Sequence, residues 1–226
     1  MVWIKICGIT NTEDALKIAC LGADALGFVL STDSPRKIKA SKVKEIIITV
    51  KEKFMDLSGY KLPSFAGVFA NETIEAVTKA ADKLELDFMQ FCGNEDTEYM
   101  LKVKKQFKNI KLIKMIIIKE YILSIKSLLP HLQKYKNTVD YFLLDTYKEN
   151  FYGGMGISFN WELVKGLSRE FSVILAGGLD SKNVSEAIKT VKPFGIDAST
   201  RLEESPGKKD ITKVEIFIKN ALKNAD

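Results

Sequence analysis

A cysteine and an aspartate are the side chains of this sequence best suited to moving protons, because each one closes an apolar run. Cys7 ends the run WIKIC and is followed by Gly8, and Asp145 ends the run YFLLD. A thiolate at Cys7 would be a useful base, since an unperturbed cysteine is already slightly ionised at neutral pH. A carboxyl group at Asp145 would be a useful acid if desolvation raised its pKa by roughly 2 to 3 units. An acid and a base directed at one ligand predict isomerisation by proton transfer.

Both residues also have ordinary structural interpretations. A lone cysteine before a helix is usually a small buried hydrophobic residue, and an aspartate at a strand end is often solvated or paired with a cation. The strand end, the adjacent Gly8 and a predicted helix N-terminus favour the thiolate interpretation of Cys7. We interpret Cys20, on the apolar side of the first predicted helix, as a core residue.

Two short polar or glycine motifs follow the last apolar runs of the chain. Gly177 and Gly178 come directly after SVILA, and Ser199 and Thr200 come directly after FGIDA. Glycines allow backbone N–H groups to approach phosphate oxygens closely, and a helix N-terminus adds a favourable dipole. The glycine pair alone is equally consistent with a tight turn. Together with Ser199 and Thr200 it predicts a phosphate site.

The elements that must position these residues alternate along the chain between short apolar runs and amphipathic stretches. Strands are predicted at 2–6, 25–30, 65–69, 86–91, 111–118, 141–145, 172–176 and 194–198, each followed by a helix. Eight such units predict a single-domain, eight-stranded parallel (β/α)8 TIM barrel over residues 1–226. An open doubly wound sheet is the alternative, but the count of eight and the lack of a GxGxxG turn disfavour it.

Several local features of these elements follow from residue type. Thr10 and Glu13 have the spacing of a capping box for the first helix. The fifth helix is predicted to start near Tyr121 and to break near Pro130, which places the only histidine, His131, in a loop-like surface stretch. Asp210 is predicted to cap the last helix. The helix after the sixth strand is expected to pass through Trp161 and Val164, and residues 51–62 are interpreted as an insertion between the second helix and the third strand.

Barrels of this kind place their active sites at the carboxyl ends of the strands, which is where Cys7, Asp145 and the two phosphate motifs fall. Asp140 begins the sixth strand and is instead expected at the opposite face. The sequence predicts no metal site, because its three cysteines are far apart and it has one histidine. No cofactor motif is present either.

Composition restricts the cellular context. The net charge of +5 comes mostly from lysines interleaved with apolar residues, which is typical of solvated helix faces, so we expect no nucleic-acid partner. The start of the chain lacks the pattern of a signal peptide, and no uncharged apolar run has the roughly 20 residues of a membrane span. We therefore expect a cytoplasmic protein that acts on a small phosphorylated molecule.

The motifs, taken together and in order, resemble phosphoribosylanthranilate isomerase of tryptophan biosynthesis. They are KICGIT at 5–10, GFVLSTDSPR at 27–36, GVFAN at 67–71, MQFCGNE at 89–95, LLDT at 143–146, GGMG at 153–156, LAGGL at 175–179, DAST at 197–200 and ESPGKKD at 204–210. The resemblance implies a (β/α)8 barrel and an aldose-ketose isomerisation without cofactor or metal. The implied reaction is the Amadori rearrangement of N-(5'-phosphoribosyl)anthranilate.

The resemblance also implies roles for individual residues. Asp145 would donate a proton to the furanose ring oxygen, and Cys7 would remove the proton from C2'. Arg36 would bind near the anthranilate carboxylate, where a guanidinium fork is suitable. The implied phosphate and loop residues are Gly154, Gly156, Gly177, Gly178, Asp197, Ser199 and Thr200. The family includes monomers and dimers, so we expect a monomer or a homodimer.

Three positions depart from the family's usual pattern. Cys92 stands where a histidine is usual, Met155 where a threonine or serine is usual, and Arg201 where a glycine is usual. The alternatives are another phosphosugar-binding barrel enzyme, such as indole-glycerol phosphate synthase or a pentose-phosphate epimerase, and a non-catalytic phosphate or nucleic-acid binder. The sequence does not show the catalytic lysine with carboxylates at strand ends that the synthase would need, or the metal-ligating histidines with paired aspartates that the epimerase would need. Arg201 and the lysine content motivate the second.

Overall fold

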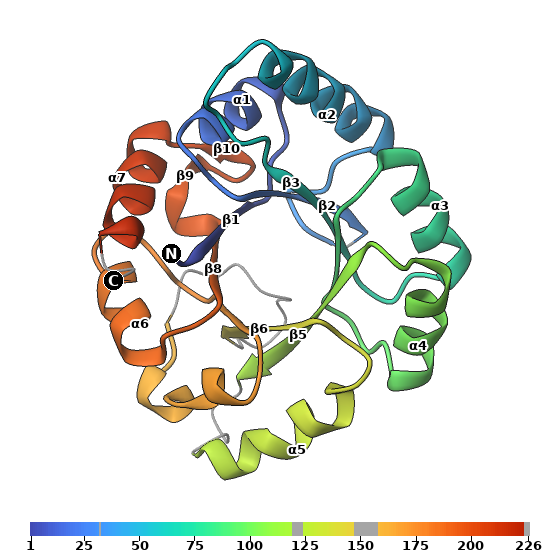
Figure 1. The fold of residues 1–226 in the computed structure, drawn as a ribbon, viewed down its shortest axis with the longest axis vertical. Coiled ribbons are helices and arrows are strands. Elements are labelled where there is room, and N and C mark those ends of the chain that lie inside the picture. The colour runs from blue at the N-terminus through green and yellow to red at the C-terminus, as the bar shows by residue number, and fades with distance from the viewer. Residues whose placement is uncertain (32, 119–123, 147–157, 224–226) are drawn as a thin grey trace.

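Eight parallel strands close into a barrel in sequence order, with the last strand paired to the first (Figure 1). The computed structural model describes residues 1–31, 33–118, 124–146 and 158–223. The strands are β1 (Trp3–Cys7), β2 (Ala25–Ser31), β3 (Ser64–Phe69), β4 (Phe88–Phe91), β5 (Lys111–Ile118), β6 (Tyr141–Thr146), β7 (Val173–Leu175) and β8 (Gly195–Ala198). The predicted TIM barrel is confirmed.

Helices surround the barrel and follow the strands in turn (Figure 1). They are α1 (Thr12–Cys20), α2 (Ala40–Met55), α3 (Ile74–Leu84), α4 (Thr97–Gln106), α5 (Ile125–Tyr135), α6 (Val184–Val191) and α7 (Ile211–Leu222). After β8 the chain forms the 3-10 turn η3 (Thr200–Leu202) and a hairpin of β9 (Glu203–Ser205) and β10 (Lys208–Lys209) before α7. No helix within the described ranges has both the length and the apolar character needed to cross a membrane.

The expected helix through Trp161 and Val164 is two 3-10 turns instead, η1 (Trp161–Val164) and η2 (Leu167–Arg169). Gly166 separates them with a positive φ of 86°, a left-handed conformation that no α-helix continues through. The prediction of one regular helix here was wrong because a single glycine in an amphipathic pattern gives only a weak signal of a break.

Two helix boundaries were also predicted incorrectly. Asn11, not Thr10, caps α1: its Oδ1 accepts from the Asp14 N–H at 2.8 Å and its Nδ2 donates to the Asp14 carboxylate at 2.8 Å. The Thr10 hydroxyl instead donates to the carbonyl of Gly207, which ties the first loop to the last hairpin. Helix α2 runs through Met55, so residues 51–55 are helix and the connection to β3 covers only 56–63.

The predicted break at Pro130 does not occur, because Pro130 lies inside α5. Pro130 is exposed on the outer face of the helix, where water can take over the backbone hydrogen bond that proline removes. His131 is therefore helical rather than in a loop, and its side chain is exposed as expected. The predicted start at Tyr121 lies outside the described residues. Asp210 caps α7 as predicted, accepting from the Lys213 N–H at 3.1 Å.

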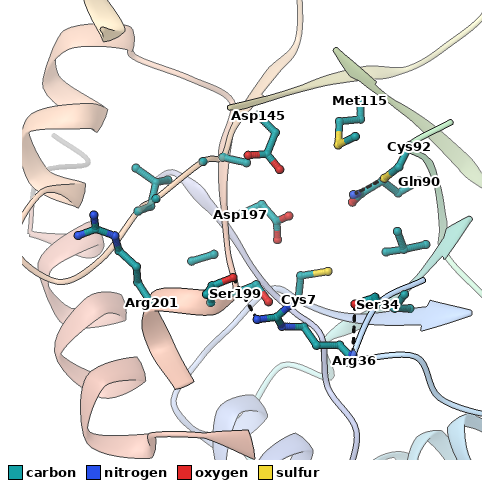
Figure 2. A pocket seen from close by; sticks show the side chains of 18 residues that line it. Cys7, Ser34, Arg36, Gln90, Cys92, Met115, Asp145, Asp197, Ser199 and Arg201 are labelled. Atoms are coloured by element: carbon teal, nitrogen blue, oxygen red, sulfur yellow. Dashed lines mark hydrogen bonds between the residues drawn. The ribbon is translucent and has the colours of Figure 1, made fainter. Parts of the chain in front are cut away.

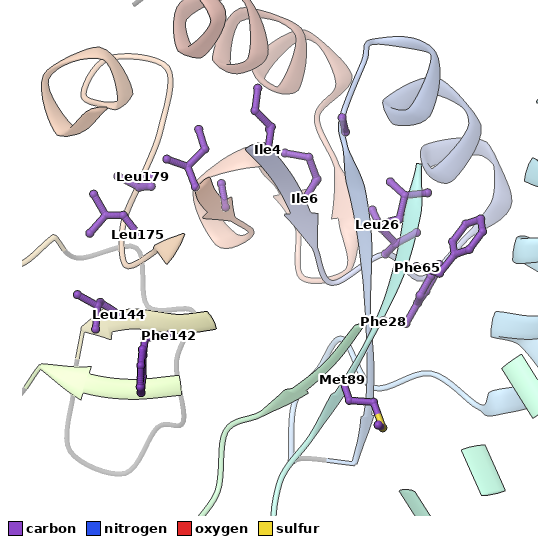
Figure 3. Packing of buried hydrophobic residues seen from close by; sticks show 14 of the residues in the cluster. Ile4, Ile6, Leu26, Phe28, Phe65, Met89, Phe142, Leu144, Leu175 and Leu179 are labelled. Carbon is purple, nitrogen blue, oxygen red and sulfur yellow. The ribbon is translucent and has the colours of Figure 1, made fainter. Parts of the chain in front are cut away.

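Strand alternation divides the core into two layers. On β1, Ile4 and Ile6 extend toward the surrounding helices and belong to the larger apolar layer (Figure 3). Lys5 and Cys7 occupy the opposite face of the strand, inside the barrel. Cys20, expected in the core, is exposed at the last residue of α1. The barrel interior thus combines a small apolar cluster with buried charged groups on the neighbouring strands β1 and β8.

Candidate active site

A pocket lies at the carboxyl ends of the barrel strands, where the sequence places its candidate residues (Figure 2). Among its lining residues are the predicted Cys7, Arg36, Asp145, Gly177, Gly178, Asp197, Ser199 and Thr200, together with Ser34, Gln90, Cys92 and Met115. Gly154 and Gly156, with Met155 between them, lie outside the described residues. The structure therefore gathers every described candidate into one site.

The two proposed proton-transfer groups approach this pocket from different walls. Cys7 is the last residue of β1, and Asp145 is the fifth of the six residues of β6. Figure 2 shows the sulfur and the carboxylate directed into the same space. Asp145 is half-buried, and its Oδ1 accepts from the N–H of Thr146 at 2.7 Å, which fixes the orientation of the carboxylate. A single small ligand in the pocket has access to both groups.

A buried ion pair lies directly beneath Cys7. Lys5, fully buried, donates to Asp197 Oδ1 at 2.9 Å, and the two residues face each other in the β1–β8 register. Burial acts to lower the pKa of the Lys5 ammonium, but Asp197 and Cys7 outweigh it and raise that pKa above its ordinary value. Lys5 is therefore a permanent positive charge within reach of the Cys7 sulfur.

The thiol itself differs from the sequence-based expectation. Burial raises the pKa of Cys7 above its ordinary value, and the neighbouring Lys5 opposes this effect only in part. The strand end is enclosed rather than open to water, which opposes the ionisation that the strand end and helix N-terminus were expected to favour, and the role of Cys7 as a base stays a prediction. The positive charge of Lys5 remains the feature that makes ionisation of this buried sulfur less costly.

Arg36 is held by a carboxylate that the sequence analysis did not single out. Its Nε and Nη2 donate to the two oxygens of Glu203 at 2.8 and 2.7 Å, and Nη2 also reaches Thr200 Oγ1 at 3.2 Å. Lys209, almost fully buried, donates to the same Glu203 at 2.8 Å and lies 3.3 Å from Ser199 Oγ. One carboxylate thus joins the loop after β2 to the loop after β8.

This bridge stays ionised for a clear electrostatic reason. Burial raises the pKa of the Glu203 carboxyl, but Arg36 and Lys209 together outweigh burial and hold that pKa below its usual value. Burial lowers the pKa of the Lys209 ammonium, and Glu203 opposes that shift. Lys209 and its neighbours belong to the motif ESPGKKD, so the motif was recognised while the buried lysine within it was missed.

The loop after β7 approaches β6 so closely that only glycine fits. Gly177 and Gly178 have positive φ values of 80° and 64°. A Cβ at Gly177 would overlap Thr146 and would stand 3.1 Å from Asp145 Oδ1. Both conformational freedom and lack of a side chain are therefore required at Gly177. The strand end that carries Asp145 and the predicted phosphate loop form one packed unit.

Two residues of β4 and its following loop complete the far wall of the pocket. Gln90 is buried, and its Nε2 donates to Cys92 Sγ at 3.3 Å. Burial raises the pKa of the Cys92 thiol to about 12, so this sulfur is a neutral thiol at physiological pH. Cys92 therefore adds a polarisable, uncharged contact where a histidine was expected from the family pattern.

Arg201 points away from Cys7 in the close view (Figure 2). Its Nη1 forms an ion pair with Asp180 Oδ2 at 2.6 Å, and its side chain is 42% exposed. The guanidinium thus lies at the rim of the pocket. Among the described residues, no group of three or more histidine, cysteine, aspartate or glutamate side chains is arranged to hold a metal ion.

A family model and individual relatives with the same description both match this chain over most of its length. Residues 4–220 match the family model described as N-(5'phosphoribosyl)anthranilate (PRA) isomerase. A protein of that name from Petrotoga mobilis is 40% identical over 218 residues, covering 95% of this chain and 94% of the relative. A relative of the same name from Caldanaerobacter subterraneus is 39% identical over 96% of this chain.

Solved structures show the same similarity. The phosphoribosyl anthranilate isomerase of Thermotoga maritima is 33% identical, with a TM-score of 0.83, covering 99% of this chain and all of the other. A further structure, at 33% identity and a TM-score of 0.80, is a complex of such an isomerase with reduced 1-(o-carboxyphenylamino)-1-deoxyribulose 5-phosphate. Another Thermotoga maritima structure is described as monomers generated from a dimeric enzyme.

Proposed function

The chain belongs to the N-(5'-phosphoribosyl)anthranilate isomerase family, and from this premise we propose how its pocket carries out the reaction. The protein is an isomerase of tryptophan biosynthesis. It converts N-(5'-phosphoribosyl)anthranilate to 1-(2-carboxyphenylamino)-1-deoxyribulose 5-phosphate, an aldose-ketose isomerisation in which C1' is reduced and C2' is oxidised. The observation that carries the proposal is the convergence of Cys7 and Asp145 on a pocket bordered by the glycine loop after β7.

In the first step, Asp145 donates its proton to the furanose ring oxygen. The bond between C1' and that oxygen breaks, and the nitrogen lone pair forms an iminium with C1'. The Thr146 N–H donates to Asp145 Oδ1, which orients the carboxyl group for this transfer. Asp145 leaves this step as a carboxylate.

In the second step, the Cys7 thiolate removes the proton from C2'. The electron pair of the C–H bond moves to neutralise the iminium, giving an enolamine that tautomerises to the ketone. Lys5 supports this step because its ammonium charge stabilises the thiolate in a buried site. Cys7 gains one proton and Asp145 loses one, so the two exchange a proton through solvent or product before the next cycle.

The charge of the pocket supports an anionic substrate. Lys5, Arg36 and Lys209 contribute three positive charges, and Asp197 and Glu203 contribute two negative charges. With Asp145 protonated, as the first step requires, an excess of one positive charge lies in and beside the pocket. An excess charge in a low-dielectric site favours a ligand of opposite sign. The phosphate and the anthranilate carboxylate of the proposed substrate meet this requirement.

The proposed binding roles divide between the two sides of the cluster. Gly177, Gly178, Ser199 and Thr200 would hold the phosphate, since their backbone groups border the pocket where glycine allows close approach. Arg36, held by Glu203, would face the anthranilate carboxylate. Asp197 would act through Lys5 and the loop after β8 rather than on the substrate itself.

Steady-state turnover of two variants tests the mechanism. Cys7→Ala and Asp145→Asn should each reduce kcat by at least about a thousandfold, because each removes a group needed for proton transfer. Cys20→Ala and Asp140→Asn are matched controls: Cys20 is exposed on α1, and Asp140 precedes the amino end of β6, where it accepts from the Leu112 N–H. Full activity in either test variant would remove that residue from the mechanism.

Growth of a tryptophan auxotroph that lacks this isomerase tests the function as a whole. Complementation by the wild-type chain and its failure with Cys7→Ala is the expected pair of results. Well-expressed wild-type protein that supports no growth would contradict the proposed activity.

We further propose a cytoplasmic location, no nucleic-acid partner and a monomeric or homodimeric state. The charge supports the second of these, because 34 basic and 29 acidic residues leave only +5. RNA binding that is measurable at 150 mM salt and weakens steeply with ionic strength would contradict it. Sedimentation velocity separates monomer from dimer, and cell fractionation checks the location.

A further inference from the structure

One polar atom in the pocket is buried and has no partner among the described residues. Gln90 lies on β4 and is 4% exposed. Its Nε2 donates to Cys92 Sγ at 3.3 Å, but its Oε1 accepts no hydrogen bond from any residue that the structure describes. Figure 2 shows the amide facing the same space as Cys7 and Asp145. A strong acceptor is thus held without a donor at the wall of the catalytic pocket.

The surroundings of this atom explain why the protein does not satisfy it. Cys92 and Met115 flank the amide in the pocket, and Val68 of the adjacent β3 is apolar. The Cys92 thiol already accepts from Nε2. Buried polar groups are nearly always paired, and an unpaired acceptor in a native site requires a specific reason. A donor brought by the ligand is such a reason.

The position of Gln90 restricts which part of a ligand can reach it. In the closed barrel, β4 lies opposite β8, so Gln90 is across the pocket from the loop that carries Ser199 and Thr200 (Figure 2). The phosphate of the proposed substrate binds on that far side. The remaining donors of the substrate are its amine N–H and its ribose hydroxyls.

We propose that Gln90 is a specificity-determining residue whose Oε1 accepts a hydrogen bond from the amine or a ribose hydroxyl of the substrate. The proposal rests on the isomerase function given above. A site with a buried acceptor discriminates strongly against analogues that lack the donor, because such an analogue leaves the acceptor unpaired. Gln90 therefore selects the central part of the ligand, whereas the glycine loop selects its phosphate.

The test compares two ligands in one variant. Gln90→Met keeps an unbranched side chain of similar length and removes both polar atoms. We expect reduced 1-(o-carboxyphenylamino)-1-deoxyribulose 5-phosphate to bind about tenfold to a hundredfold more weakly to this variant, and inorganic phosphate to bind unchanged. We also expect the unfolding midpoint of the free variant to stay level or rise, since an unpaired buried acceptor has been removed. Met100→Leu, an apolar change on α4 in the core outside the pocket, is the matched control and should alter neither affinity by more than about threefold.

These experiments test the role of Gln90 and the isomerase function separately. Unchanged affinity for the reduced compound overturns the role of Gln90. Parallel losses of both ligands together with a lower midpoint also overturn it, because they indicate a residue that only maintains the structure. If Gln90→Met does not fold, wild-type protein is compared on analogues of the reduced compound that lack the amine N–H or one hydroxyl. Equal affinity for all of them overturns the proposal. Wild-type protein that neither binds the reduced compound nor turns over the substrate contradicts the isomerase function instead.

Discussion

Replacing Lys5 by methionine should destabilise the protein severely. The ion pair of Lys5 with Asp197 has a length of 2.9 Å, and the two side chains are 0% and 9% exposed. Methionine fills most of the lysine volume but leaves the Asp197 carboxylate buried without its cation. Removing one partner of a buried pair costs about 3 to 5 kcal/mol in the free energy of unfolding. For a chain of this size that cost lowers the unfolding midpoint by roughly 6 to 20 °C.

Urea denaturation and thermal unfolding at pH 7 measure this effect. The control is Lys111→Met, because Lys111 pairs with Asp140 at 3.3 Å with 51% of its side chain exposed. An exposed pair contributes less than about 1 kcal/mol. The double variant Lys5→Met with Asp197→Asn should recover much of the lost stability, since it buries no unpaired charge. A Lys5→Met protein within 1 kcal/mol of wild type would refute the reasoning, as would a double variant no more stable than the single one.

Three further outcomes follow from the site. Burial raises the pKa of Cys92 from 9.0 to about 12, so the folded protein keeps a proton that the unfolded chain loses, and the free energy of unfolding should fall by up to about 4 kcal/mol between pH 9 and 12. Urea titrations at pH 8 and 11 should show a smaller fall for Cys92→Ala than for the wild type. An equal fall would contradict the raised pKa of Cys92. Gly177→Ala should lower kcat/KM at least about tenfold, because the added Cβ would overlap Thr146 and the positive φ is unfavourable for alanine. Unchanged kinetics would mean that the loop after β7 can move without loss of activity. Arg201→Gly should change stability by less than about 1 kcal/mol, since its ion pair with Asp180 is half exposed; a larger loss in urea denaturation would show that the pair is structural.

The barrel could be predicted from the sequence because its determinants are local. Each strand is a short apolar run and each helix has an apolar stripe, so the alternation is visible within a few residues. The predicted strand 111–118 agrees in both ends with β5. Helix ends were less accurate where two neighbouring residues could both serve as caps, as with Thr10 and Asn11.

The position of the candidate residues was predictable for a similar reason. Once eight parallel units are recognised, the carboxyl end of every strand lies at one face, and Cys7 and Asp145 follow directly. Their roles in catalysis remain predictions. The sequence could not show the buried ion pairs of Lys5 and Glu203. Lys5 only interrupts an apolar strand in the sequence, and Glu203 is one of several charged residues after β8. Their partners are 192 and 167 residues away in the chain.

The closure of β1 against β8 has a consequence for biosynthesis. Lys5 is translated before Asp197, which follows 192 residues later. At bacterial or eukaryotic elongation rates of about 5 to 20 residues per second, roughly 10 to 40 seconds separate them. During that interval the amino-terminal strand has no counter-ion for its ammonium group and no eighth neighbour. The nascent polypeptide therefore cannot close its barrel until the segment that carries β8 has left the ribosome.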